Sequence, residues 1–139
     1  ISDLADKFGS QCVVVAIDTK LVGDKWIVYT HAGTQKTDLL AINWAKEAEK
    51  YGAGELLVTS MSNDGVCNGY PINLLDAVSK SVNIPVIASG GAGTTKHFVD
   101  LFQSTDVDAA LAASVFHKQE IKIPYLKSVL KQEGVCVRI

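Results

Sequence analysis

Short runs of apolar residues alternate along this chain with longer segments in which apolar residues recur every three or four positions. Two of the short runs, Cys12–Ile17 and Ile84–Ala88, are rich in β-branched residues, and the short runs are bounded by glycine, proline or polar residues, which is typical of buried strands. The longer segments are typical of amphipathic helices. Strand and helix alternate four times, which predicts a parallel sheet with right-handed crossovers. The predicted strands are Cys12–Ile17, Glu55–Ser60, Ile84–Ala88 and Asp108–Ala113, and the predicted helices are Asp38–Tyr51, Ile72–Val82, Thr95–Gln103 and Pro124–Gln132.

Turn and capping residues place the boundaries of these elements. Gly23-Asp24 is a hairpin signal between two extended segments, of which the second is Trp26–Thr30. Thr37 or Asp38 can cap the helix of residues 38–51, and Gly52 ends it. A further helix over Leu4–Phe8 ends at Gly9, and Thr94 or Thr95 can cap the helix that follows the third strand.

Polar and small residues gather at or just after the carboxyl ends of the predicted strands. In parallel α/β architectures these ends share one edge of the sheet, where ligands bind and chemistry takes place. Asp, Ser and Gly are also ordinary turn formers, so each residue alone has a structural explanation. Their number at one edge favours a functional site, and the set is Asp18, Thr59, Ser60, Asp64, Ser89, Gly90, Gly91 and Ser114.

The stretch Ser89–Gly93 joins the third strand to its helix through three glycines. Small residues let backbone N–H groups approach an anion, and the helix start adds a partial positive charge to them. This pattern predicts a phosphate site, although a tight strand-to-helix turn that binds nothing explains it as well. The glycine spacing differs from the dinucleotide-binding fingerprint, whose third glycine comes later.

Composition narrows the choice of function. The 139 residues suffice for one domain but not for a complete (βα)8 barrel of roughly 250 residues. A net charge of -2 without a Lys/Arg cluster disfavours nucleic-acid binding. No apolar run approaches the ~20 residues of a membrane span, and the first residues do not resemble a signal peptide, so we expect a cytoplasmic protein. The chain begins without Met, which leaves open that it is a fragment.

The metal-ligating residue types show no metal-site spacing. Cys12, Cys67 and Cys136 are widely separated, and we expect reduced thiols, two of them in strand-like surroundings. His31, His97 and His117 are equally isolated and are expected to have structural or surface roles. The sequence therefore predicts no metal site.

Six motifs in order make the chain similar to a known family, the cyclase subunit of imidazole glycerol phosphate synthase. The resemblance extends over practically the whole chain and corresponds to strands five to eight of that family's barrel. It implies that residues 1–139 form a single half-barrel domain, the (βα)4 half of a TIM (βα)8 barrel. The motifs are VVVAIDTK (13–20), GAGELLVTS (52–60), NDG (63–65), NGY (68–70), IPVIASGGAG (84–93) and AALAASVFH (109–117).

The resemblance implies a reaction of histidine biosynthesis without a cofactor. Ammonia from a glutaminase partner and a bis-phosphorylated ribulosyl imidazole-carboxamide yield imidazole glycerol phosphate and an aminoimidazole carboxamide ribotide. Asp18 matches a catalytic general acid/base, and Asp64 matches a further active-site acid. Glu55 matches a charged residue of the ammonia gate at the bottom of the barrel. The substrate and phosphate sites are matched by Thr59, Ser60, Gly65, Ser89, Gly90, Gly91, Ala113 and Ser114.

The chain also departs from the family's pattern. It has Ser62-Asn63-Asp64 where many relatives have Asp-Arg-Asp, and Cys67 and Pro71 replace commoner polar residues. The aspartate that opposes Asp18 and the second phosphate site belong to the other half of the family's barrel. An isolated half is therefore expected to bind one phosphate and to catalyse poorly or not at all.

A half-barrel leaves its first and fourth strands as unpaired apolar edges, which favour association. We therefore expect a homodimer or a larger even-numbered oligomer. Three interpretations stay open: half of the cyclase, active when complemented; a phosphate-binding half-barrel without turnover; and a module for assembly with another half-barrel or the glutaminase. Paralogous pathways that use ammonia on the same scaffold also stay open.

Overall fold

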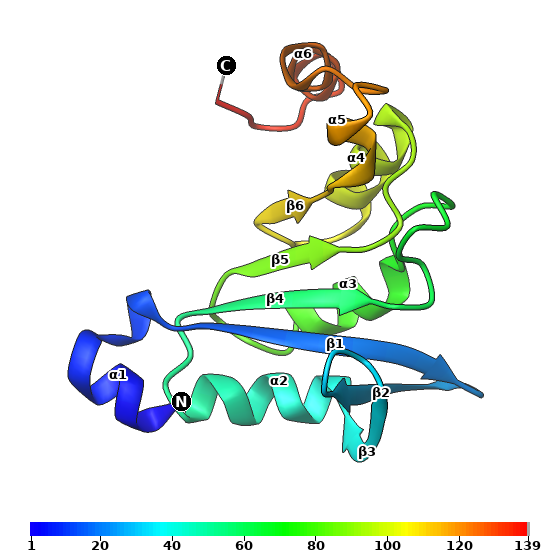
Figure 1. Cartoon of the computed structure of the whole chain (residues 1–139). Helices are drawn as coiled ribbons and strands as arrows, with labels where there is room; N and C mark the ends of the chain where they lie inside the picture. Colours follow the sequence, from blue (N-terminus) through cyan, green and yellow to red (C-terminus); the bar gives the residue numbers. More distant parts are fainter. Residues whose placement is uncertain (139) are drawn as a thin grey trace.

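A computed structural model describes residues 1–138, which form a six-stranded sheet flanked by helices (Figure 1). The strand order is β3-β2-β1-β4-β5-β6, in which β1, β4, β5 and β6 run parallel and β2 and β3 extend the sheet as antiparallel strands. The strands are β1 (Val14–Val22), β2 (Lys25–Thr30), β3 (Gln35–Leu40), β4 (Glu55–Ser60), β5 (Val86–Ser89) and β6 (Ala109–Leu111). The helices are α1 (Ser2–Phe8), the 3₁₀ turn η1 (Ser10–Cys12), α2 (Ala41–Lys50), α3 (Ile72–Ser79), α4 (Thr95–Ser104), α5 (Ser114–His117) and α6 (Ile123–Gln132).

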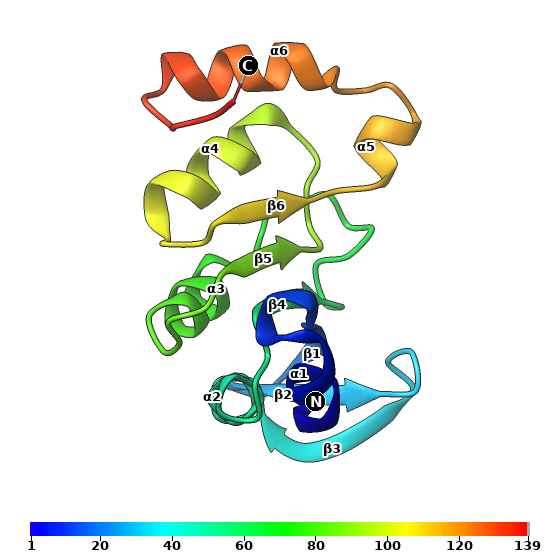
Figure 2. The ribbon, with the colours of Figure 1, turned by 90° about the vertical axis from the view of Figure 1, so that its left-hand side faces the viewer.

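One face of the parallel strands is covered by helices. Paired residues in a parallel register lie on the same face, and the rows Val15/Leu56/Val86 and Ile17/Val58/Ala88 form the helix-covered face. Helices α2, α3 and α4 lie side by side along it (Figure 2). Leu56, Val58 and Ala88 are at most 1% exposed, so the core lies between these strands and helices.

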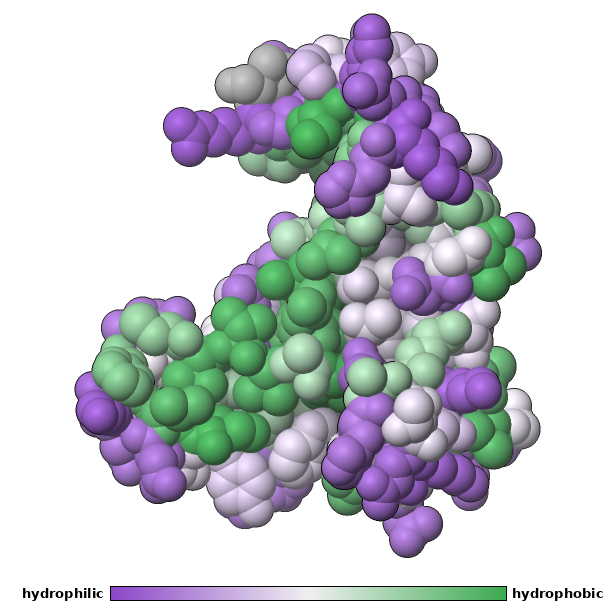
Figure 3. All heavy atoms as spheres, viewed as in Figure 1, coloured by the Kyte–Doolittle hydropathy of each residue, from purple (hydrophilic) through white to green (hydrophobic). Residues whose placement is uncertain are grey.

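The opposite face of the sheet is open. Its central row is Ala16, Leu57, Ile87 and Ala109, and a hydrophobic surface lines the hollowed side of the molecule (Figure 3). Val14 and Leu111, on the same face, are 51% and 44% exposed. In a closed barrel these residues would point into the packed interior. The architecture is that of half a (βα)8 barrel, as the sequence predicts.

The predicted start of the helix over residues 38–51 is wrong, because strand pairing overrides the local helix signals. Asp38 to Leu40 belong to β3, and α2 begins at Ala41 without a side-chain cap. The Thr37 hydroxyl, predicted to cap the helix, instead donates to the Val28 carbonyl (2.7 Å) on the neighbouring strand. The Gly23-Asp24 hairpin is confirmed, since it joins β1 to β2. The structure also adds the short helix α5 after β6.

The first strand is not the free edge that the sequence predicts. It extends to Val22, and Asp18–Val22 pairs with β2, so only Val14–Ile17 lacks a partner strand on that side. The other end of the sheet is β6, which is three residues long. All three cysteines are free thiols, as expected, but they are exposed and lie outside the strands, so the predicted strand-like surroundings are wrong.

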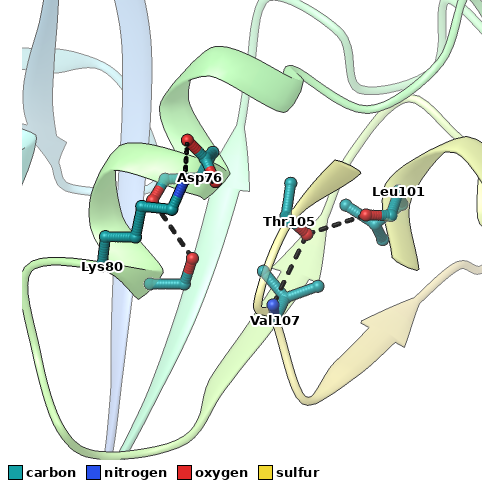
Figure 4. A network of polar contacts seen from close by, with 6 residues as sticks. Asp76, Lys80, Leu101, Thr105 and Val107 are labelled. Carbon is teal, nitrogen blue, oxygen red and sulfur yellow. Dashed lines mark hydrogen bonds and ion pairs between the residues drawn. The ribbon is translucent and has the colours of Figure 1, made fainter. Parts of the chain in front are cut away.

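Side-chain hydrogen bonds stabilise the C-terminal ends of two helices that flank the sheet, α3 and α4 (Figure 4). The Thr105 hydroxyl, 9% exposed, donates to the Leu101 carbonyl (2.8 Å) at the end of α4 and accepts the N–H of Val107 (3.4 Å). At the end of α3, Lys80 forms an ion pair with Asp76 one turn earlier. The hydrogen bond to Asp76 raises the pKa of Lys80. No helix within residues 1–138 has both the length and the hydrophobicity needed to cross a bilayer.

Candidate functional site

Three predicted site residues lie in one row across the carboxyl ends of the parallel strands. Asp18 on β1 is in register with Thr59 on β4, and Thr59 is in register with Ser89 on β5. At about 4.8 Å between neighbouring strands, the Cα atoms of Asp18 and Ser89 are about 10 Å apart. All three residues face the open side of the sheet, the side that would be the inside of a barrel. Asp18 is half-buried there.

Beside this row is a hollow of about 370 Å³. Its walls come from three places: the loop after β4 (residues 61–71, the β4 loop), the turn after β5 (residues 89–93, the glycine turn), and the segment between β6 and α5. Seven of the residues singled out from the sequence meet there, although they come from three separate strand ends. The lining residues are Asp64, Gly65, Ser89, Gly90, Gly91, Ala92, Leu111, Ala112, Ala113 and Ser114.

The glycine turn brings backbone, rather than side chains, to the hollow. Gly90 and Gly91 have φ values of +90° and +111°, which favour glycine. A Cβ on Gly90 would lie 2.6 Å from the Ser60 carbonyl oxygen. No acceptor within residues 1–138 pairs with the N–H of Gly91, Ala92 or Ser114. These free donors give the hollow the capacity to bind an anion.

The only charged side chain among the lining residues of the described chain is Asp64. An anion in this hollow would therefore be held by backbone N–H groups, with an exposed carboxylate nearby. That arrangement suits a ligand that carries a phosphate at one end and a group that exchanges protons at the other. It does not suit a bare metal ion, and residues 1–138 contain no cluster of three or more His, Cys, Asp or Glu side chains that would hold one.

Two residues that the sequence analysis left without a site role connect the loop after β4 to the glycine turn. Asn63 accepts a hydrogen bond from the Ser60 hydroxyl (2.8 Å) and donates one to the Gly69 carbonyl (3.0 Å). The Gly69 N–H then donates to the Gly91 carbonyl (2.8 Å). In the sequence, both residues occur in the family motifs NDG and NGY, but no local signal predicts their contacts. These contacts depend on the conformation of the loop.

Tyr70 extends this connection to β6. Its ring is 6% exposed and packs edge-on against Phe98, at 5.6 Å between centroids. Its hydroxyl donates to the Leu111 carbonyl (3.1 Å) at the end of β6. Burial raises the pKa of Tyr70, so the phenol remains a neutral donor. One side chain thereby ties the β4 loop to the far wall of the hollow.

His97 has the structural role expected from its isolated position. Its Nδ1 accepts the N–H groups of Gly93 (3.1 Å) and Thr94 (3.3 Å), so Thr94 is the N-cap of α4, one of the two predicted caps. These two backbone donors are used within the protein. The N–H groups of Gly91 and Ala92, by contrast, have no acceptor within residues 1–138 and line the hollow.

Four predicted site residues do not line the hollow: Asp18, Thr59, Ser60 and Glu55. Asp18 and Thr59 lie on the open face beside it, as described above. Ser60 is fully buried on the helix-covered face, where its hydroxyl bonds to Asn63. Glu55 lies at the opposite end of β4, four residues and about 13 Å from Thr59 on the same face. The structure thus separates Glu55 from the hollow by the length of the strand.

A hollow lined by backbone N–H groups at the carboxyl ends of parallel strands, beside the start of a short helix, is typical of (βα)8 enzymes that bind phosphorylated ligands. The family described as "Histidine biosynthesis protein" matches residues 1–122, and the chain belongs to this family. It is also similar over its whole length to imidazole glycerol phosphate synthase subunits HisF. The identity is 55% with HisF of Hydrogenobaculum sp. (100% of this chain, 56% of the relative) and 55% with HisF of Flavobacterium johnsoniae (100% and 55%). It is 50% with HisF of Staphylococcus carnosus (99% and 55%). The chain thus spans about half the length of the curated relatives it matches.

Proposed function

We propose that this chain supplies half of the cyclase barrel of an imidazole glycerol phosphate synthase and acts in the ammonia-dependent cyclisation step of histidine biosynthesis. The observation that carries the proposal is the 55% identity over the entire chain with two HisF subunits. In this proposal the substrate carries two phosphates, and one of them occupies the hollow between the β4 loop, the glycine turn and α5. No cofactor is required.

The chemistry follows from the two carboxylates at this edge of the sheet. Ring closure requires protons to be moved on and off nitrogen and oxygen, which suits aspartates that act as general acid and base. Asp64 borders the hollow, and Asp18 lies across β4 from Ser89. A phosphate held at Gly91 and Ser114 would fix one end of the substrate and orient the reacting atoms between these groups.

The proposal includes two partners, because the chain accounts for about half of its relatives' length. The first is a complementary half-barrel, which would cover the open apolar face and bring the second phosphate site. The second is a glutaminase subunit that supplies ammonia, in agreement with the relatives being named as subunits of a synthase. We place the ammonia entrance at the end of the sheet where Glu55 lies, opposite the hollow.

An ammonia-dependent cyclase assay, with and without an added N-terminal half-barrel, tests the proposal. We expect turnover only in the complemented sample. Asp18→Asn in that sample should lower the rate about 100-fold or more, as removal of a general acid or base does. Asp24→Asn in the β1–β2 turn is a matched control and should leave the rate unchanged. Full turnover by the Asp18→Asn variant would remove Asp18 from the mechanism.

A second candidate function is a phosphate-binding half-barrel that self-associates without turnover. The exposed Val14 and Leu111 on the open face favour it, because exposed apolar patches are typical of protein–protein interaction sites. A dimeric mass in light scattering at micromolar concentration, together with thermal protection by inorganic phosphate and no turnover in either sample, would establish this alternative. A monomeric mass would exclude self-association at that concentration.

A further inference from the structure

The side-chain amide of Asn63 is held by two hydrogen bonds that fix its direction. The Gly69 carbonyl can only accept, so the amide nitrogen of Asn63 faces it, at 3.0 Å. The amide oxygen of Asn63 therefore faces Ser60, whose buried hydroxyl donates to it at 2.8 Å. Asn63 thus joins the end of β4 to the far side of its own loop.

Gly69 transmits this constraint to the glycine turn. Its N–H donates to the Gly91 carbonyl at 2.8 Å, and Gly91 packs directly onto it. A Cβ on Gly91 would lie 2.7 Å from the Gly69 carbonyl carbon and 3.1 Å from the Asn63 Cβ, closer than van der Waals contact allows. Loop and turn are therefore in backbone contact, and a shift of Gly69 must displace Gly91.

These contacts decide the geometry of the hollow. One wall carries Asp64, which follows Asn63 directly in the loop, and another carries the free N–H groups of Gly91 and Ala92. The geometry points to Asn63 as a positioning residue that sets the separation between the Asp64 carboxylate and the anion-binding N–H groups. This inference rests on the proposed role of the hollow as a phosphate site, and it assigns Asn63 no contact with the substrate.

The first test is the affinity of the chain for inorganic phosphate, measured by calorimetric titration at a temperature where every variant is folded. Asn63→Ala removes both hydrogen bonds. Because the loop is then no longer held against the glycine turn, we expect phosphate to bind about tenfold more weakly, which corresponds to about 1.4 kcal/mol. Asn68→Ala is the matched control, since Asn68 is exposed in the same loop and its side chain makes no hydrogen bond within residues 1–138. Its affinity should stay within twofold of the parent chain.

The second test does not depend on phosphate. The exchange rate of the Gly69 amide, read by NMR, reports the hydrogen bond to Gly91. We expect about tenfold faster exchange in Asn63→Ala and no change in Asn68→Ala. Asn63→Asp keeps the acceptor for Ser60 but loses the donor to Gly69, so it should also speed exchange.

The two measurements separate the possible failures. Unchanged phosphate affinity in Asn63→Ala, or unchanged Gly69 exchange, would overturn the positioning role. A parent chain that binds no phosphate would refute the phosphate site in the proposed function. Gly69 exchange would then still decide whether Asn63 holds the loop against the glycine turn.

Discussion

Replacement of Gly91 by alanine is the most direct probe of the glycine turn. A side chain at φ +111° is strained, which costs on the order of 1–3 kcal/mol. The added Cβ would also lie 2.7 Å from the Gly69 carbonyl carbon, and overpacking against backbone costs a further 1–3 kcal/mol or so. Together these effects predict a loss of about 4 kcal/mol in the free energy of unfolding, a large fraction of the ~5–15 kcal/mol of a typical domain.

The assay is equilibrium denaturation followed by Trp fluorescence, with Gly65→Ala as the matched control. Gly65 also has a positive φ, +74°, but nothing lies within 4 Å of the Cβ position. Its replacement therefore adds only backbone strain and should cost about 1–2 kcal/mol. For a chain of this size, about 4 kcal/mol corresponds to a fall in Tm of about 15 °C. Equal losses in the two variants would refute the argument that close packing against Gly69 makes glycine necessary at position 91.

Two further predictions concern buried hydroxyl groups. Tyr70→Phe removes the hydrogen bond to Leu111 and should lower the free energy of unfolding by about 1 kcal/mol. Burial raises the pKa of Tyr70 above its ordinary value of 10.0. Above pH 10 the unfolded state releases the phenolic proton first, so the free energy of unfolding of the parent chain should fall as the pH rises. Denaturation curves over the same pH range should show a smaller fall for Tyr70→Phe. Thr105→Val removes the hydrogen bonds to Leu101 and Val107 and should lower the free energy of unfolding by about 1 kcal/mol in thermal denaturation. Ser128→Ala removes a similar hydrogen bond from an exposed helix position and should change the Tm little. Equal effects of Thr105→Val and Ser128→Ala would contradict the role given to burial.

The sequence predicted the parallel units well because their signals are local. β4 has the predicted bounds Glu55–Ser60, since a short apolar run between a glycine and a polar loop has few alternatives. The alternation of strands and helices also placed polar and small residues at one edge, and five of that set line one hollow: Asp64, Ser89, Gly90, Gly91 and Ser114. The prediction was wrong at Asp38–Leu40, where pairing with β2 competes with a helix start.

The chemical identity of the site residues was likewise readable before the structure, but their contacts were not. Nothing local distinguishes Asn63 from Asn68, two asparagines in one loop. Only one of them bridges Ser60 and Gly69. Ser60 shows the same limit, because the two-residue period of a strand decides which face each residue occupies, and register placed Ser60 among the helices and Thr59 on the open side.

Sequence alone thus determined the four parallel βα units, the family resemblance that implied a half-barrel, and the strand edge that carries Asp18, Asp64 and the glycines. These properties depend on periodicity and on residue type at short range. Tertiary structure alone decided which of these residues share a hollow, that the first strand is half covered by its hairpin, and that the β4 loop is held on the glycine turn through Asn63, Gly69 and Gly91. The physical reason is that such contacts depend on how separate backbone segments are arranged in space, and they form only when the backbone of one segment is already in place to receive the other.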